Sequence, residues 1–330
     1  MLTKLDPYWN GTKIYKMKDI SQFQNALLEV YKEFASFCEQ NNITFFAAYG
    51  TMIGAIRHHG FIPWDDDIDV FMKRDEYERF VSLRHTLEGT SYRISIYLDG
   101  DSPYPFAKFH TTKGTIWEYP QFPFVIGPWI DVFPIDEGDE TDPVANKVLE
   151  EFHYTMWKYR KSIAHSSWKN ILHDFAHFNI VNASVKTFKK IRYAPFKQKY
   201  IKEINNCIDK IRKIKGNTLR CYSTALTNEV FEKQWFEKPI SVPFEDTTIF
   251  VPNGYHEFLS SLYGDYMQLP PEEKRVSHNE FYIDLEHTKT IDEIIKENPN
   301  ILAQEHPLSL KIIWYEIKHR QKGYLRPKKK

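Results

Sequence analysis

The sequence predicts an α/β protein in which a mixed sheet and its helices form a core, with a mainly helical segment added to it. Two observations support this prediction. Over roughly the first 140 residues, short apolar runs alternate with longer segments of helical periodicity, the pattern of strands and helices within one domain. From about residue 141 to residue 215 the strand-like runs stop, and the chain becomes helical, basic and poor in glycine.

The first 90 residues carry alternating helix and strand signals. Residues 19–41 are expected to form a helix, because apolar side chains recur there at three- and four-residue spacing until two asparagines end the pattern. Residues 43–49 form a short apolar run that ends at a glycine, as expected for a buried strand, and residues 51–57 can then begin a helix. A second strand is expected at 68–72, followed by a charged amphipathic helix at 75–87.

Strand signals continue beyond this region. Three short strands are expected at 92–98, 104–110 and 114–118, and a fourth at 128–134 is bracketed by prolines. Because no repeat or low-complexity linker interrupts the chain, these runs are expected to belong to one sheet-containing core.

The chain is accordingly divided into three parts. Residues 1–140 are expected to form the core, and residues 141–240 a mainly helical addition. Residues 241–330 return to mixed structure; they are expected to complete the core and to end in a basic tail at 326–330.

Charge and cysteine content exclude some classes of function. Lys and Arg together number 44, as do Asp and Glu, so the formal net charge is zero. A general nucleic-acid binder needs a basic surface, and we expect no nucleic-acid partner. The three cysteines fit neither a disulfide framework nor a zinc site, and the chain shows no signal peptide or apolar span, so a cytoplasmic location is expected.

An acidic segment between two apolar runs carries the strongest chemical signal. Asp67 and Asp69 alternate with Ile68 and Val70, so on a strand both carboxylates project to the same side. Asp65 joins them if the extended backbone begins earlier. Several carboxylates on one face repel one another unless a cation neutralises them, and oxygen ligands suit Mg²⁺ or Mn²⁺.

The same acids have a plainer interpretation as a polar turn after a strand, since a lone Asp-x-Asp matches many sequences by accident. The apolar neighbours argue against a turn, because an unpaired carboxylate between them would be costly to bury. Upstream, Gly50 and Thr51 end one strand and begin a helix, where free backbone N–H groups favour a phosphate. Arg57 is expected to add a bidentate phosphate contact.

A third acid completes the pattern. Asp131 lies between Ile130 and Val132 within an expected strand. It is either part of the same site or a buried aspartate paired with a nearby lysine or arginine. A Gly-Thr turn, an Asp-x-Asp and a strand-borne Asp together are the pattern of the nucleotidyltransferase superfamily.

Three separated blocks give this pattern a specific resemblance. Residues 49–72 resemble the signature of the LicD family, which is related to fukutin and fukutin-related protein. Residues 250–278 are similar to the family's second signature, a Tyr-Gly-Asp-Tyr followed by Pro-Pro and a basic residue, and residues 130–134 fall where the family carries its third acid. Lys73 departs from the pattern, since relatives often have proline there. The resemblance implies that residues 1–140 are a nucleotidyltransferase-like catalytic core.

The resemblance also implies a reaction. Family members transfer phosphocholine, or a related phospho-alcohol, from a CDP-activated donor to a glycan such as lipopolysaccharide, teichoic acid or capsule polysaccharide. The implied roles are Asp65, Asp67, Asp69 and Asp131 as metal ligands, with Asp67, Asp69 and Asp131 catalytic. Lys108 would lie near the donor phosphates, or else be a solvated strand lysine. Arg275 and His278 would contact donor or acceptor, or else belong to a structural clasp.

Two rival functions and two further features remain open. A glycosyltransferase could use the Asp-x-Asp with a nucleotide-sugar, and an inactive glycan-binding protein could share the fold. A choline headgroup would suit an aromatic box built from Trp64, Trp117, Trp129 and Tyr104. The basic run 186–202 could contact the inner face of a membrane near a lipid-linked glycan, or be a solvated helix face.

Overall fold

The computed structural model describes residues 20–100, 102–138, 141–164, 171–172, 175–176, 180–224, 229–275, 277, 281–298 and 301. Its centre is a mixed sheet with the strand order β1-β2-β6-β4-β3. These strands are β1 Phe46–Ala47, β2 Asp69–Lys73, β6 Trp129–Gly138, β4 Ala107–Thr111 and β3 Tyr92–Ser95. The predicted α/β class with a mixed sheet is confirmed.

One pair of neighbouring strands makes the sheet mixed. Strands β2 and β6 run parallel, whereas β1 and β2, β6 and β4, and β4 and β3 are antiparallel. The long strand β6 pairs near its end with β7 (Thr218–Arg220), which in turn pairs with β8 (Val230–Glu232). Strands β7 and β8 therefore extend the core sheet, although the sequence placed their residues in the helical addition.

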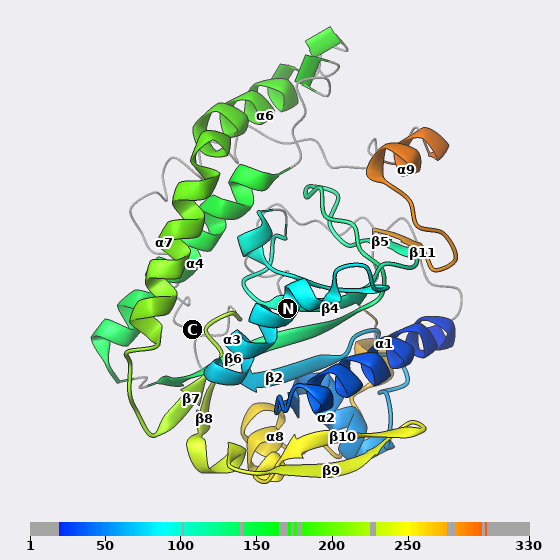
Figure 1. Ribbon diagram of the computed structural model, residues 1–330, viewed down its shortest axis with the longest axis vertical. Coiled ribbons are helices and arrows are strands. Elements are labelled where there is room, and N and C mark those ends of the chain that lie inside the picture. Colours follow the sequence, from blue (N-terminus) through cyan, green and yellow to red (C-terminus); the bar gives the residue numbers. More distant parts are fainter. Residues whose placement is uncertain are drawn as a thin grey trace.

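Helices cover both faces of the sheet. Helix α1 (Ile20–Gln40) buries Phe34, which contacts Phe80 and Phe109 at ring distances of 5.7 and 5.6 Å. Helix α3 (Arg74–Ser82) follows β2 directly. In Figure 1, α2, α8 and the β9–β10 hairpin gather beyond β2, away from β4. These elements are α2 Tyr49–Ile53, the π-helical turn Gly54–His58, α8 Tyr255–Tyr263, β9 Pro239–Phe244 and β10 Thr247–Pro252.

The helical addition projects from one end of the sheet in Figure 1. It contains α4 (Pro143–Ile163), α6 (Ile180–Tyr193) and α7 (Lys197–Ile211). Helix α4 begins where it does because the Asp142 side chain accepts a hydrogen bond from the Val144 amide at 2.8 Å, with proline at the first turn. Within the described residues, no helix is both long and apolar enough to cross a membrane.

The C-terminal segment returns to the core through a second, small sheet. Strand β11 (Tyr282–Asp284) pairs with β5 (Thr115–Trp117), and α9 (Ile291–Glu297) follows it. Around the buried Trp117, this segment builds a separate apolar cluster with Phe281, Tyr282, Ile294 and Ile301. The boundaries 140 and 240 between the three expected parts stay predictions.

A buried histidine on β4 should make the fold sensitive to acid. His110 contacts Ser95 Oγ at 2.9 Å and the Thr111 carbonyl at 3.0 Å, and burial lowers its pKa to about 4. The unfolded chain, with an ordinary histidine pKa, binds the extra proton at higher pH than the folded chain does. Stability should therefore fall as the pH drops below about 6.5.

We expect the free energy of unfolding to lose roughly 2 kcal/mol through His110 between pH 7 and pH 5. In urea unfolding at these two pH values, His110→Gln should reduce the difference by that amount. The exposed His85 provides a matched control, because His85→Gln should leave the pH dependence unchanged. An equal acid loss in wild type and His110→Gln would contradict the assignment.

Candidate active site

Strand register places three charged residues in one row across the sheet. Asp69 on β2 lies opposite Asp131 on β6, and Asp131 lies opposite Lys108 on β4. Residues that are partners in register project to the same face of a sheet. We call these three residues, two aspartates and one lysine, the acidic row. They lie up to 62 positions apart in the sequence.

Lys108 is buried at one end of the acidic row. Its Nζ lies 2.8 Å from Asp131 Oδ1 and 3.4 Å from Glu118 Oε2, and the residue is only 1% exposed. The ammonium also faces the rings of Trp129 and Tyr104, at 4.0 and 4.2 Å from their centroids. The alternative of a solvated lysine is wrong, and Asp131 does pair with a lysine; a contact between Lys108 and donor phosphates stays a prediction.

Burial decides the protonation of Asp131. Loss of solvent raises the pKa of its carboxyl to about 6, the Lys108 ammonium opposes that rise, and the charges of Glu118 and Asp67 add to it. A carboxylate with a pKa in this range can both accept and release a proton near neutral pH. The acidic segment and β6 are direct neighbours, because Asp69 pairs in register with Asp131.

Backbone contacts fix the acidic segment at both sides. The Asp69 amide donates to Thr51 Oγ1 at 2.8 Å, and the Ala48 amide donates to the Asp69 carbonyl at 2.9 Å. On the other side, the Asp131 amide donates to the Ile68 carbonyl at 2.9 Å. Thr51 thus positions Asp69 through its hydroxyl; its expected phosphate contact stays a prediction.

Gly50 is needed for a close approach by Asp65. A Cβ at Gly50 would lie 2.7 Å from Asp65 Oδ2, closer than real Cβ contacts allow. The preceding Tyr49 has a φ of 44°, in the left-handed region. The Asp65 carboxyl group therefore lies against the first turn of α2, where backbone N–H groups favour negative charge. Phosphate binding at Gly50 remains a prediction.

Two arginines connect the second family signature, residues 250–278, with the first, residues 49–72. Arg57 Nη1 donates to the carbonyls of Tyr266 and Gln268, at 2.6 and 3.3 Å. Arg275 Nε donates to the Pro270 carbonyl at 2.9 Å, and its guanidinium lies 5.3 Å from the Trp64 ring centroid. These contacts are those of a clasp. Donor contacts by Arg57 and Arg275 stay predictions, and His278 lies outside the described residues.

Two glutamates and two tyrosines near the acidic row were missed by the sequence reasoning. Tyr49 donates a 2.6 Å hydrogen bond to Glu229, which is only 5% exposed. Burial raises the pKa of Tyr263, and the charges of Glu229 and Asp69 raise it further. Glu118, which contacts Lys108, follows an apolar run, so strand alternation could have revealed it. Glu229 offered no comparable signal.

The four aromatic residues expected to form a headgroup box do not gather in one place. Trp129 and Tyr104 face the Lys108 ammonium. Trp117 is fully buried in the second apolar cluster, and Trp64 lies beneath Arg275. The expectation of a single box from these four residues is wrong, because Trp117 is fully buried in a separate cluster and cannot join the rings of Trp129 and Tyr104.

The acidic row suits a divalent cation whose coordination is completed by substrate phosphates and water. In the described part of the chain, no three His, Cys, Asp or Glu side chains form a cluster able to hold an ion. Mg²⁺, however, is usually bound by one or two carboxylates together with substrate phosphates and water. The paired Asp69 and Asp131 match that requirement, because they lie in register on adjacent strands. Lys108 Nζ lies 2.8 Å from Asp131 Oδ1 and offsets part of the negative charge at that end of the row.

Comparisons with known proteins identify the family of this chain. Residues 42–167 match the family model described as LicD/FKTN/FKRP, nucleotidyltransferase domain. Lipopolysaccharide cholinephosphotransferase LicD of Haemophilus influenzae is 33% identical over 282 residues, which cover 80% of this chain and 97% of that protein. Uncharacterized proteins of Rickettsia typhi and Rickettsia prowazekii are 32% and 30% identical over 69 and 70 residues. These segments cover 21% of this chain, and 22% and 26% of the two relatives.

The fold, the acidic row and the matched domain define a protein with a nucleotidyltransferase domain. The chain belongs to the LicD family. All four predicted acids and Lys108 lie within the matched residues 42–167, whereas Glu229 and the second signature lie outside them.

The buried ion pair leads to a stability prediction. Lys108→Met should lower the free energy of unfolding by about 3 kcal/mol, because it leaves the Asp131 carboxylate, whose side chain is only 14% exposed, without its cation. Adding Asp131→Asn should restore at least roughly half of that loss, since the uncompensated charge is gone.

Urea unfolding of the single and double variants measures this coupling. Lys32→Met is the matched control, because the pair between Lys32 and Asp246 is exposed and its loss should change stability far less. Additive losses in the Lys108 and Asp131 variants would show that the two residues do not stabilise each other.

Proposed function

We propose that the protein transfers phosphocholine, or a related phospho-alcohol, from a CDP-activated donor to a hydroxyl of a cell-surface glycan. Family membership supports this proposal, together with the relative named lipopolysaccharide cholinephosphotransferase, which aligns over 97% of its own length. The observation that carries it is the acidic row, which sets two carboxylates in register on adjacent parallel strands beside a buried lysine.

We further propose Mg²⁺ or Mn²⁺ as the cofactor. Asp69 and Asp131 would hold it together with the donor phosphates, and Asp67 and Asp65 are the further ligands that the family resemblance implies. When bound, such an ion offsets the negative charge of the donor diphosphate and of the departing CMP.

The chain's own residues then have separate tasks. The acceptor oxygen forms a bond to the distal phosphorus, the bond from that phosphorus to the CMP oxygen breaks, and the hydroxyl proton passes to a carboxylate. Asp131 or Asp67 takes that proton. Lys108 favours the ionised form of Asp131 and holds it in place, so it acts as a positioning residue. Arg57, Arg275 and His278 contact donor or acceptor in this proposal.

The nucleotide product tests the proposal. With CDP-choline, lipopolysaccharide and Mg²⁺, we expect CMP release that stops when EDTA removes the metal. UDP- and GDP-sugars should yield no product. Release of a nucleoside diphosphate with sugar transfer would instead establish a glycosyltransferase, and glycan binding without turnover would establish an inactive binding protein.

Two substitutions test the carboxylates. Asp69→Asn and Asp67→Asn should each lower kcat by at least about 100-fold, the size of loss typical of a group that stabilises transition-state charge. Both should fold normally and melt no lower in metal-free buffer, because charge repulsion falls. Asp246→Asn, in an exposed turn, is the matched control. Near-normal turnover of either active-site variant would remove that residue from the assignment.

The proposed acceptor is a lipid-linked glycan, and we propose that the enzyme works in the cytoplasm with peripheral contact to the inner membrane face. Helix α6 and the residues after it present Phe188, Ile191 and Phe196, which are 39%, 62% and 42% exposed. Tyr193 and Tyr200 of the same basic run are buried instead. Exposed apolar side chains beside basic ones suit an anionic lipid surface. The basic residues are Lys186, Lys190, Arg192, Lys197, Lys199 and Lys202.

Sedimentation with phosphatidylglycerol vesicles tests this contact. Each basic residue contributes about 1 kcal/mol near such a surface, and salt screens that attraction over about 10 Å. Binding should therefore be reversible and lost by about 0.5 M salt. Lys190→Glu with Arg192→Glu should weaken it at low salt, whereas the control Lys213→Glu with Lys215→Glu should not. Equal pelleting of wild type and both variants would refute the contact.

A further inference from the structure

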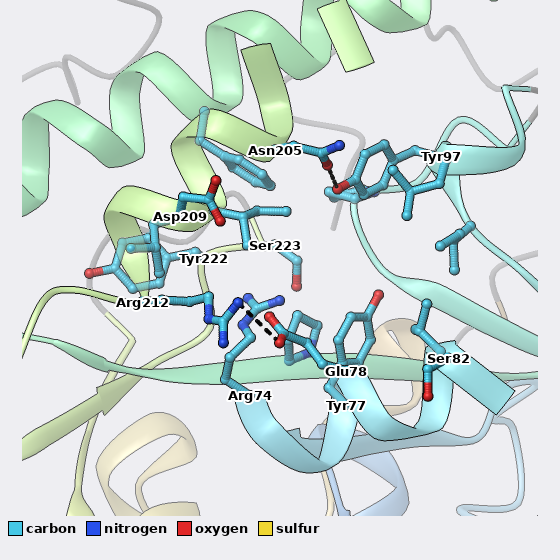
Figure 2. Close-up of a pocket in the computed structure, with 18 of the residues that line it drawn as sticks. Arg74, Tyr77, Glu78, Ser82, Tyr97, Asn205, Asp209, Arg212, Tyr222 and Ser223 are labelled. Atoms are coloured by element: carbon cyan, nitrogen blue, oxygen red, sulfur yellow. Dashed lines mark hydrogen bonds and ion pairs between the residues drawn. The ribbon is translucent and has the colours of Figure 1, made fainter. Parts of the chain in front are cut away.

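A cavity of about 420 Å³ lies between α3 of the core and α7 of the helical addition, as Figure 2 shows. Its volume falls within the range of about 300–1,000 Å³ that is usual for small-molecule sites, which often lie between domains. Part of its floor is Arg74, the first residue after β2.

The cavity is separate from the acidic row. Arg74 lies five positions beyond Asp69, which corresponds to roughly 16 Å along a strand. Pro134 also lines the cavity, and it lies three positions after Asp131 on β6, so its side chain projects to the opposite face of the sheet. A ligand in this cavity would therefore not occupy the site proposed for the donor.

Polar and aromatic groups converge on the cavity from both sides. Figure 2 shows Tyr77 and Glu78 reaching in from α3, with Asn205 and Asp209 on α7 across from them. Tyr97 supplies an aromatic wall, and its hydroxyl donates to Asn205 Oδ1 at 2.6 Å. The remaining lining is largely apolar; it includes Ile96, Leu98, Pro105, Phe152, Ile208 and Ile211.

Each arginine of the lining already has a carboxylate partner. Arg74 makes two hydrogen bonds to the buried Asp136, from Nε at 2.7 Å and Nη2 at 2.6 Å. Arg212 Nη1 lies 3.3 Å from Glu78, and Arg84 Nε lies 3.6 Å from Asp99. Asp209 adds a further negative charge. The cavity therefore has no surplus of positive charge with which to attract a phosphate or another anion.

The balance of charge points to a neutral ligand with many hydroxyl groups. A hydroxyl donates to Asp209 or Glu78 and accepts from an arginine N–H, so a polyol can use these groups without breaking the ion pairs. The apolar face of a sugar ring also suits the tyrosine and aliphatic walls. We propose that this cavity is a second ligand site, which binds a neutral sugar unit of a glycan. The proposal does not depend on the transfer reaction.

Direct binding to the full chain tests the second site, with EDTA present and nucleotide absent so that the acidic row stays unloaded. The probes are the methyl glycosides of glucose, galactose and N-acetylglucosamine, with inorganic phosphate as the anionic comparison. Ligand-observed NMR and calorimetry should show saturable binding of at least one neutral glycoside and none of phosphate. Saturable binding of phosphate alone, or of no probe, would overturn the proposal.

Two variants locate the binding. Leu98→Trp adds bulk from a partly exposed position of the lining and should abolish sugar binding. Asp209→Asn should weaken binding about tenfold, the effect of losing one charge-assisted hydrogen bond. Glu39→Gln removes an equally exposed carboxylate on α1 and should leave affinity unchanged. Wild-type affinity in both cavity variants would place the sugar elsewhere.

Measuring CMP release by the Leu98→Trp protein distinguishes failure of the second-site proposal from failure of the proposed transfer function. That variant should still release CMP from CDP-choline as wild type does, because Leu98 lies outside the acidic row. Loss of sugar binding with retained CMP release supports a second site. Loss of both would show that the cavity is part of the catalytic site and would refute the proposal.

Discussion

The parallel pairing of β2 with β6 is the constraint on which the proposed site depends. That register sets Asp69 beside Asp131, and the antiparallel pairing of β6 with β4 adds Lys108 to the same row. A shift of one residue in either pairing would turn one set of side chains to the opposite face. The helices matter because they hold this register: α1 packs its aromatic face on one side, and Phe258 of α8 contacts Phe71 of β2 at 5.9 Å on the other.

Placing charge inside this sheet has an energetic cost. Lys108, Asp131 and Glu118 lie together with little access to water, and the desolvation of such groups is repaid only when they are paired. The rings of Trp129 and Tyr104 add favourable contacts to the same ammonium. An arrangement of this kind suits a site in which a carboxyl group must be held in one position and have a pKa close to the working pH.

The second family signature contributes to the site by being held against the first. Arg57 extends from the turn after α2 to two carbonyls near residue 266, and Arg275 stacks on Trp64, which directly precedes the acidic segment. Tyr263, at the end of α8, lies within electrostatic range of the acidic residues. Segments separated by about 200 residues are thus in direct contact.

The sequence by itself determined the fold class and the family, because strand periodicity and family motifs depend on local residue order. It also predicted Asp67, Asp69 and Asp131 as site residues, and their roles stay predictions. Only the tertiary structure decided that Lys108 is buried against Asp131 and that Glu229 reaches Tyr49. It also decided that Trp117 packs in a separate cluster and that β7 and β8 join the core sheet. These outcomes depend on long-range pairing, which sets the partner and solvent exposure of each side chain and leaves no periodic trace in the sequence.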